Sequence, residues 1–219
     1  MTKFTTLMLG ATAALLCTSA FAAEDPEVAA QSGDKVAMKY NAGDRENVQR
    51  PMPSTQTACA VHIAPTVDRR QNKETVGQNL SGALLAGDVS PWVTDGLRQL
   101  KDYGFTVSDT TADAPVADDG VTVRTSITRA YTWQIGLKLF SMVAVKAEFA
   151  DRNGVLQQKY YRAHGDKTNM WGASSEYVTT LNYGLNNMLP FIAKDLASLC
   201  KGDKVAAYSY AGPEGPSAK

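Results

Sequence analysis

The stretch of sequence that decides the fold runs from residue 121 to residue 163 and reads VTVRTSITRAYTWQIGLKLFSMVAVKAEFADRNGVLQQKYYRA. Its first part, up to Ile135, alternates between apolar and polar residues, which is the period of a β-strand. The apolar positions of this part are Val121, Val123, Ile127, Tyr131, Trp133 and Ile135. We therefore expect one long strand with these side chains on one face, and Tyr131 and Trp133 packed beneath a helix.

The remainder of this stretch predicts two more strands. Residues 139–150 are apolar on both faces where the strand begins, which indicates a central place in the sheet. The turn at 151–154 (DRNG) is typical of a hairpin, because Asn-Gly accepts the positive φ that tight hairpins require. Residues 155–163 are then expected to return antiparallel, carrying Tyr160 and Tyr161.

One helix is expected before this stretch in the sequence, and another is expected after it. Residues 90–103 place apolar side chains at three- and four-residue spacing, and Gly104 suits a left-handed helix end. Residues 174–199 carry a longer apolar stripe, which Pro190 is expected to kink. Both helices are amphipathic, so each needs a sheet face to cover.

Two shorter strands complete the expected order. Residues 59–67 alternate, and residues 105–107 open a strand directly after the first helix. The elements then follow one another as strand, helix, strand, strand, strand, strand, helix. The fold class is therefore α+β, a two-layer sandwich in which two helices cover a mostly antiparallel sheet.

The N-terminal residues 1–22 are typical of a secretory signal. Lys3 precedes a short apolar run, and residues 20–22 (AFA) form a cleavage site after Ala22. Cys17 raises the alternative of a lipoprotein signal, but Leu16 before it is unsuited to that processing. We expect a periplasmic protein, with a membrane tether disfavoured and association with the outer membrane left open.

Cleavage of this signal leaves two cysteines, Cys59 and Cys200. An exported protein folds in an oxidising compartment, where two such cysteines are expected to form a disulfide. The bond would join the first strand to the last helix and close the fold.

Composition divides the rest of the chain. Residues 23–57 are polar and proline-punctuated, which predicts a flexible leader, and residues 202–219 predict a disordered tail. A single domain is expected between them, at 58–201. The chain has 22 basic and 22 acidic residues, and this balance argues against a nucleic-acid binder.

Several short stretches within residues 59–200 together form a recognisable pattern. They are 61–70 (VHIAPTVDRR), 97–100 (LRQL) leading into 103–107 (YGFTV), 147–149 (AEF) with Asn153-Gly154, Tyr160-Tyr161, and 182–186 (NYGLN). In these stretches the chain resembles the YajG-like family of Gram-negative envelope lipoproteins. The resemblance implies a small α/β envelope domain, although the family's lipoprotein cleavage motif is not matched here.

Two clusters of polar residues are candidate binding sites. Asp68, Arg69 and Arg70 follow the first strand, and their guanidinium groups could grip a carboxylate or phosphate. The alternative is a solvated turn with a local Asp–Arg pair. His164, Asp166 and Trp171 lie between the last strand and the last helix, where they could form a partner-binding lip. Trp171 could equally close the end of the core.

The sequence contains no motif typical of a catalytic, metal or cofactor site. We therefore expect a non-enzymatic envelope protein that binds another envelope component or a lipid-like ligand, through a sheet edge or the loops at 68–79 and 164–173. One alternative is a hydrolase or metal-dependent enzyme built on His62, His164, Asp68 and Asp166. Another is a purely structural envelope protein. The oligomeric state is left open.

Overall fold

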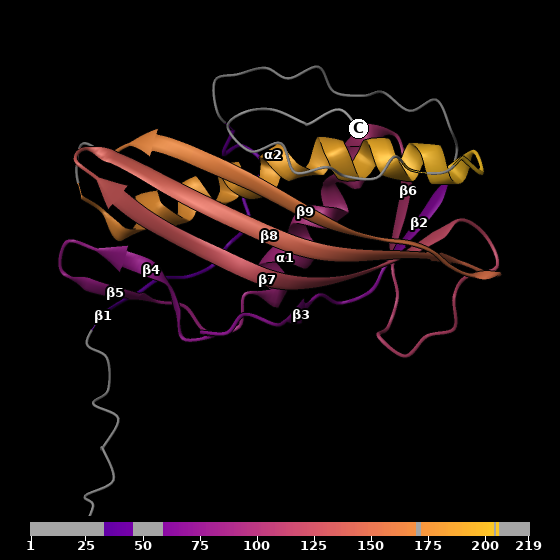
Figure 1. Cartoon of the computed structure of the whole chain (residues 1–219), viewed down its shortest axis with the longest axis horizontal. Helices are drawn as coiled ribbons and strands as arrows, with labels where there is room; N and C mark the ends of the chain where they lie inside the picture. The colour runs from indigo at the N-terminus through magenta and orange to yellow at the C-terminus, as the bar shows by residue number, and fades with distance from the viewer. Residues whose placement is uncertain (1–32, 46–58, 170–171, 204, 206–219) are drawn as a thin grey trace, which may run out of the picture. The chain divides into compact units, whose positions relative to one another are not determined.

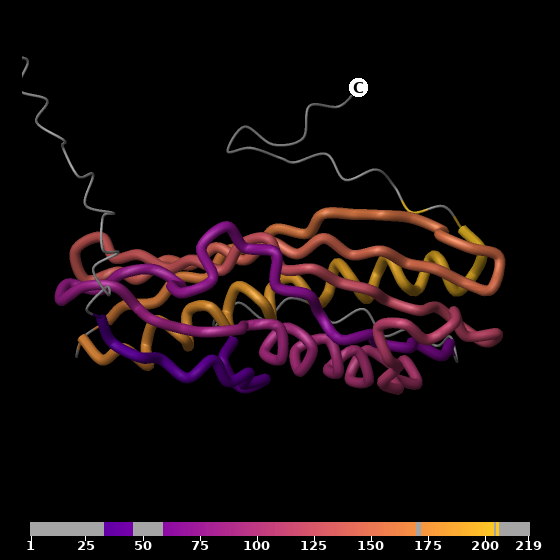
Figure 2. The backbone as a smooth tube through the Cα atoms, turned by 90° about the horizontal axis from the view of Figure 1, so that it is seen from below, coloured from indigo at the N-terminus to yellow at the C-terminus, as the bar shows by residue number. Residues whose placement is uncertain are grey.

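The computed structural model describes residues 33–45, 59–169, 172–203 and 205. Within these residues nine strands form one sheet, and the helices α1 (Ser90–Leu97) and α2 (Ser174–Cys200) lie together on one side of it (Figures 1 and 2). A 3₁₀ segment, η1 (Arg98–Tyr103), continues α1 up to Gly104, which has the left-handed φ of 94°. The α+β class with a large sheet and two helices is confirmed.

The order of the strands differs from the expected one. The strands are β1 (Gly33–Lys35), β2 (Ala60–Ile63), β3 (Val67–Asp68), β4 (Thr75–Asn79), β5 (Gly82–Leu85), β6 (Thr106–Asp109), β7 (Val121–Ile135), β8 (Lys138–Asp151) and β9 (Gly154–Thr168). Their spatial order is β1-β5-β4-β7-β2-β6, with β8 beside β7 and β9 beside β8. The expected order is wrong because it lacks β1, β4 and β5, and because the single strand expected at 59–67 is divided into β2 and β3. Strands of three to five residues are too short to show a period.

The long strand β7 organises this mixed sheet. On one side it pairs antiparallel with β8, and β8 pairs in the same way with β9. On the other side three short strands pair with it in parallel, one after another along its length. β2 meets β7 near Val121, β3 meets it at Ile127, and β4 meets it at Thr132.

A β-bulge divides β7 into two halves. The ladder with β8 passes from Ile127 directly to Arg129, so Thr128 is the extra residue, and its hydroxyl donates to the carbonyl of Ala144 at 3.2 Å. An extra residue exchanges the two faces of a strand beyond it. Ile127 is therefore fully buried beneath the helices, whereas Tyr131 lies on the opposite face and is 39% exposed. The expectation that Tyr131 and Trp133 pack beneath a helix is wrong for this reason.

The disulfide between Cys59 and Cys200 is confirmed. The two residues are 141 positions apart in sequence, and their Cα atoms are 6.0 Å apart. The bond ties the residue before β2 to the end of α2. Closing so long a loop stabilises the fold by about 4–5 kcal/mol in the chain-entropy account.

Residues 33–45 fall inside the segment expected to be a flexible leader, but the structure packs them against the domain. β1 pairs in parallel with β5, and the amide groups of Asn182 and Asn186 on α2 donate to backbone carbonyls of Lys39, Asn41 and Asp44. These buried amides need partners, and this segment supplies them. The signal, the rest of the leader and most of the tail lie outside the described residues.

Candidate functional site

A groove of about 1020 Å³ opens on the face of the sheet that points away from α2, at the bulge of β7. Pairing of β3 with β7 stops at Ile127, and β4 pairs with β7 only at Thr132. The groove lies in the interval between these contacts, beneath the loop of residues 69–74. Its lining residues are Arg69, Arg70, Gln71, Asn72, Thr75, Thr128, Arg129, Ala130, Tyr131, Met142, Ala144, Tyr160, Tyr161 and Arg162.

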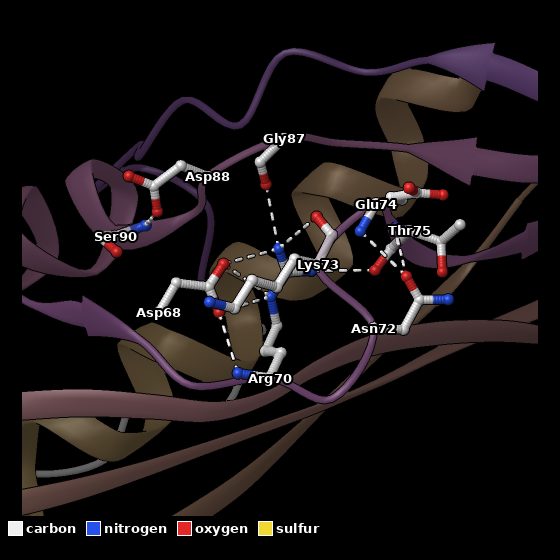
Figure 3. A network of polar contacts seen from close by, with 9 residues as sticks. All are labelled: Asp68, Arg70, Asn72, Lys73, Glu74, Thr75, Gly87, Asp88 and Ser90. Atoms are coloured by element: carbon white, nitrogen blue, oxygen red, sulfur yellow. Dashed lines mark hydrogen bonds and ion pairs between the residues drawn. The ribbon is translucent and has the colours of Figure 1, made fainter.

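A buried ion pair holds the loop wall of the groove in place. The Arg70 guanidinium binds Asp68 through Nε, at 3.1 Å from each carboxylate oxygen, and through Nη2, at 2.8 Å from Oδ2 (Figure 3). The same guanidinium donates to the carbonyls of Lys73, Thr75 and Gly87 at 2.9–3.0 Å. One side chain thereby fixes the loop and the connection between β5 and α1.

The environment of Asp68 shows that this pair is ionised. Burial by itself would raise the pKa of the Asp68 carboxyl, but hydrogen bonds and charge from Arg70 outweigh it and hold the pKa below its usual value. The side chains of Asp68 and Arg70 are only 7% and 3% exposed. The local Asp–Arg pair that the sequence suggested is therefore present, but it is buried rather than solvated, and Arg70 serves the loop.

Three other arginines present their side chains to the groove. Arg69, Arg129 and Arg162 are exposed and come from the loop, β7 and β9 in turn. Arg129 and Arg162 lie opposite the same β8 residue, Ala144, so they face each other across that strand. No aspartate or glutamate is among the described residues that line the groove. The groove therefore carries a positive potential suited to an anion.

The floor between these arginines is apolar and aromatic. Met142 and Ala144 of β8 form its middle, with Tyr131 on one side and Tyr160 on the other. The Nε of Arg162 lies 3.1 Å from the sulfur of Met142. Beyond the groove the aromatic surface continues, because Trp133 stacks on Tyr131 with ring centroids 6.1 Å apart. Cationic and apolar groups thus lie side by side on one face.

The second predicted cluster lies elsewhere. His164 and Asp166 belong to β9 rather than to a loop, because the strand continues to Thr168. Asp166 forms an ion pair with Lys138 of β8 at 2.6 Å. Neither residue lines the groove, although His164 lies opposite the groove residue Met142. Trp171 lies outside the described residues.

The residues of the alternative enzyme site are not assembled at one place. His62 contacts Ser108 at 2.8 Å and the backbone carbonyl of Asp119 at 2.9 Å, near the start of β7. His62 is level with Thr122 and His164 with Tyr131, so about 30 Å of strand separates them at about 3.3 Å per residue. Among the described residues no cluster of three or more His, Cys, Asp or Glu side chains could hold a metal ion.

Sequence reasoning missed Arg129, Arg162 and the tyrosines as groove residues, although one signal was present. Arg129 occupies the same parity as Ile127 and Tyr131, so a regular strand would bury its charge beneath a helix. A charged residue on the apolar parity indicates a bulge. For Arg162 and Tyr160 the sequence contains no such signal, because their role depends on which strands become neighbours.

Comparisons with known proteins give distant likenesses. No known protein family matches the chain, and no curated protein matches it. Among solved structures the chain is similar to a DUF330 protein from Xanthomonas campestris, at 8% identity over 77% of this chain and 96% of that one, with a TM-score of 0.49. It is also similar to a hypothetical protein from Chlamydia trachomatis (11% identity, 67% and 100% covered, TM-score 0.45).

The structures with such a likeness include lipoproteins of Gram-negative bacteria. One is a minor lipoprotein from Acinetobacter baumannii, with 13% identity over 64% of this chain and 93% of that one and a TM-score of 0.38. Likenesses this distant establish no function, and membership of the YajG-like family stays a prediction. Within the described residues, no helix combines the length and the apolar composition needed to span a membrane.

Proposed function

We propose that the protein is a non-enzymatic, YajG-like component of the cell envelope, exported to the periplasm, that binds an anionic lipid-like molecule. The observation that carries this proposal is the groove, in which Arg69, Arg129 and Arg162 surround an apolar floor. A guanidinium pairs with phosphate or carboxylate through two parallel hydrogen bonds. The floor offers the contact that an acyl chain needs.

The disulfide and the fixed loop wall of the groove support the same proposal. The Cys59–Cys200 disulfide is typical of an exported protein. The groove wall is pre-organised by the buried Asp68–Arg70 pair, so binding does not require the loop to be ordered first. The loop at 68–79, for which the sequence predicts ligand binding, would therefore contribute Arg69 as a ligand contact and Arg70 as the residue that positions the loop.

Binding of short-chain phosphatidylglycerol, measured by native mass spectrometry, tests the proposal. We expect Arg129→Gln and Arg69→Gln each to weaken binding about tenfold or more, because each removes a charge-assisted contact. Arg152→Gln is the matched control, since Arg152 is an exposed arginine in the turn between β8 and β9. Short-chain phosphatidylcholine should bind more weakly than phosphatidylglycerol, because it has no net negative charge.

Three results would count against this function. Equal losses in Arg152→Gln and Arg129→Gln would show that any surface charge has the same effect. Absence of lipid binding would favour the purely structural alternative. Hydrolysis of the lipid that disappears when His62 and His164 are replaced by alanine would favour the enzyme.

A further inference from the structure

Three strongly exposed aliphatic side chains lie together at one end of the sheet. Ile135 and Leu137, at the turn between β7 and β8, are 65% and 66% exposed, and Leu80, in the turn between β4 and β5, is 87% exposed. β4 runs parallel to β7 and pairs Gly77 with Thr132, so Leu80 and Ile135, each three residues further on, are level. Both turns lie at the left end of the sheet in Figure 1. We call Leu80, Ile135 and Leu137 the apolar tip.

On the outward face of β7, the side chains change from aliphatic to aromatic to cationic with distance from the apolar tip. Moving back from Ile135, the outward residues are Trp133, Tyr131 and Arg129, about 7 Å apart. Trp133 stacks between Tyr131 and Phe140, with centroid distances of 6.1 and 5.7 Å. Aliphatic, then aromatic, then cationic groups are met in this same order on leaving the hydrocarbon of a bilayer for its phosphates.

The end that carries the apolar tip is tied together by hydrogen bonds. The carboxylate of Asp34 on β1 accepts from Asn79 at the end of β4, at 2.6 Å, and from Ser174 at the start of α2, at 2.7 Å. The backbone N–H of Asn169 donates to the carbonyl of Leu137 at 2.8 Å. The exposed side chains are therefore presented by a fixed scaffold, and their exposure is not relieved by a nearby described segment.

We infer that this end of the sheet docks on the surface of a lipid bilayer. The apolar tip enters the boundary of the hydrocarbon, Trp133 and Tyr131 lie at the level of the headgroups, and Arg129 lies nearer the phosphates and the water. The groove begins directly behind, since Tyr131 and Arg129 also line it. The inference goes beyond binding in the groove and does not depend on it, because an empty groove would leave the apolar tip unchanged.

Depth measurements with a fluorophore on a single added cysteine test this docking. The probe is placed in Leu137→Cys and, as matched control, in Val155→Cys, because Val155 is 57% exposed beside the β8–β9 turn at the opposite end of the same sheet. Vesicles of phosphatidylcholine and phosphatidylglycerol that contain a brominated lipid are then added to the full exported chain. We expect several-fold stronger quenching at position 137 than at position 155. Equal quenching, or none at 137, would overturn the inference.

Substitutions in the apolar tip give an independent measurement. Ile135→Asp with Leu137→Asp should weaken binding to the same vesicles about tenfold or more, because carboxylates are disfavoured at the hydrocarbon boundary. Val155→Asp with Leu156→Asp should leave vesicle binding unchanged. Binding of short-chain phosphatidylglycerol should persist in both pairs, so a failure of vesicle docking is distinguishable from a failure of the groove. Unchanged vesicle binding in the tip variant would refute the inference.

Discussion

The two halves of β7 carry the same alternating pattern and meet opposite surroundings. Before the bulge, Val123 and Ile127 are fully buried beneath the helices. After it, Tyr131 and Ile135 occupy the same parity and lie on the open face, while the small residues Ala130 and Thr132 turn inward and are buried. One extra residue between the halves makes this difference, because the side-chain period of a strand is two.

The exchange of faces places the aromatic and charged side chains of the second half of β7 on the face of the sheet that the described helices leave uncovered. The inward side chains of the first half face a core covered by α2, where a buried charge would destabilise the fold. The second half aims its aromatic residues and Arg129 at a surface that the described helices do not cover. The bulge therefore gives one strand both a structural half and a surface half, and the groove opens where the halves meet.

The largest expected effect comes from deleting a single residue of β7, because a deletion before the bulge would exchange the faces of the residues between it and the bulge. Deleting Ser126 would move Ile127 outward and place Thr128 in the core, and we expect a loss of more than about 3 kcal/mol in the free energy of unfolding. Deleting Thr128 removes only the bulge and keeps both faces, so its loss should be about 1–2 kcal/mol. Urea denaturation of the two variants checks this order, and equal losses would contradict the account of the bulge.

Removal of the ion pair beside the bulge tests the support of the loop. Arg70→Met leaves the carboxylate of Asp68 buried without its partner and should lower the free energy of unfolding by about 3 kcal/mol. The double variant with Asp68→Asn should recover part of this loss, because no unpaired charge remains. Thermal and urea unfolding measure both variants. A single variant as stable as the wild type would show that the pair does not hold the loop.

Truncation on either side of the bulge sharpens the comparison within one strand. Ile127→Ala should cost about 2–4 kcal/mol of unfolding free energy, because it opens a cavity beneath the helices. Tyr131→Ala should cost less than about 1 kcal/mol, since Tyr131 packs only on the open face, but it should weaken lipid binding. A larger stability loss for Tyr131→Ala than for Ile127→Ala would reverse the assignment of the faces.

The smallest expected effect is a dependence on pH. Because the pKa of Asp68 is lowered in the folded protein, its contribution to stability is fully present above the unfolded value of about 4 and is lost as the pH falls through the folded value. Unfolding free energies at pH 6 and pH 3 should therefore differ less in Asp68→Asn than in the wild type. Asp113→Asn, at an exposed position, should leave the difference unchanged.

The site was only partly predictable from the sequence. Arg69 and Arg70 were identified as candidates, but their separate roles depend on burial, since Arg70 is enclosed by the carbonyls of three other residues and Arg69 is not. The sequence predicts a loop at His164 and Asp166, because nothing in it shows that β9 extends to Thr168. Arg162 and Tyr160 come close to the other groove residues only because β9 pairs with β8.

The sequence by itself determined the three long strands, the two helices and the cysteine pair. The strands and helices can be recognised because the spacing of apolar residues is a local property of the sequence, and burial of those residues stabilises the element. The tertiary structure alone decided the parallel pairing of β2, β3 and β4 with β7, the packing of residues 33–45 on α2, and the face on which Tyr131 and Trp133 lie. Each of these depends on contacts between distant residues, or on a single bulged position that shifts every side chain after it. An alternating pattern shows that a strand has two faces, but only the packed sheet determines which face is covered.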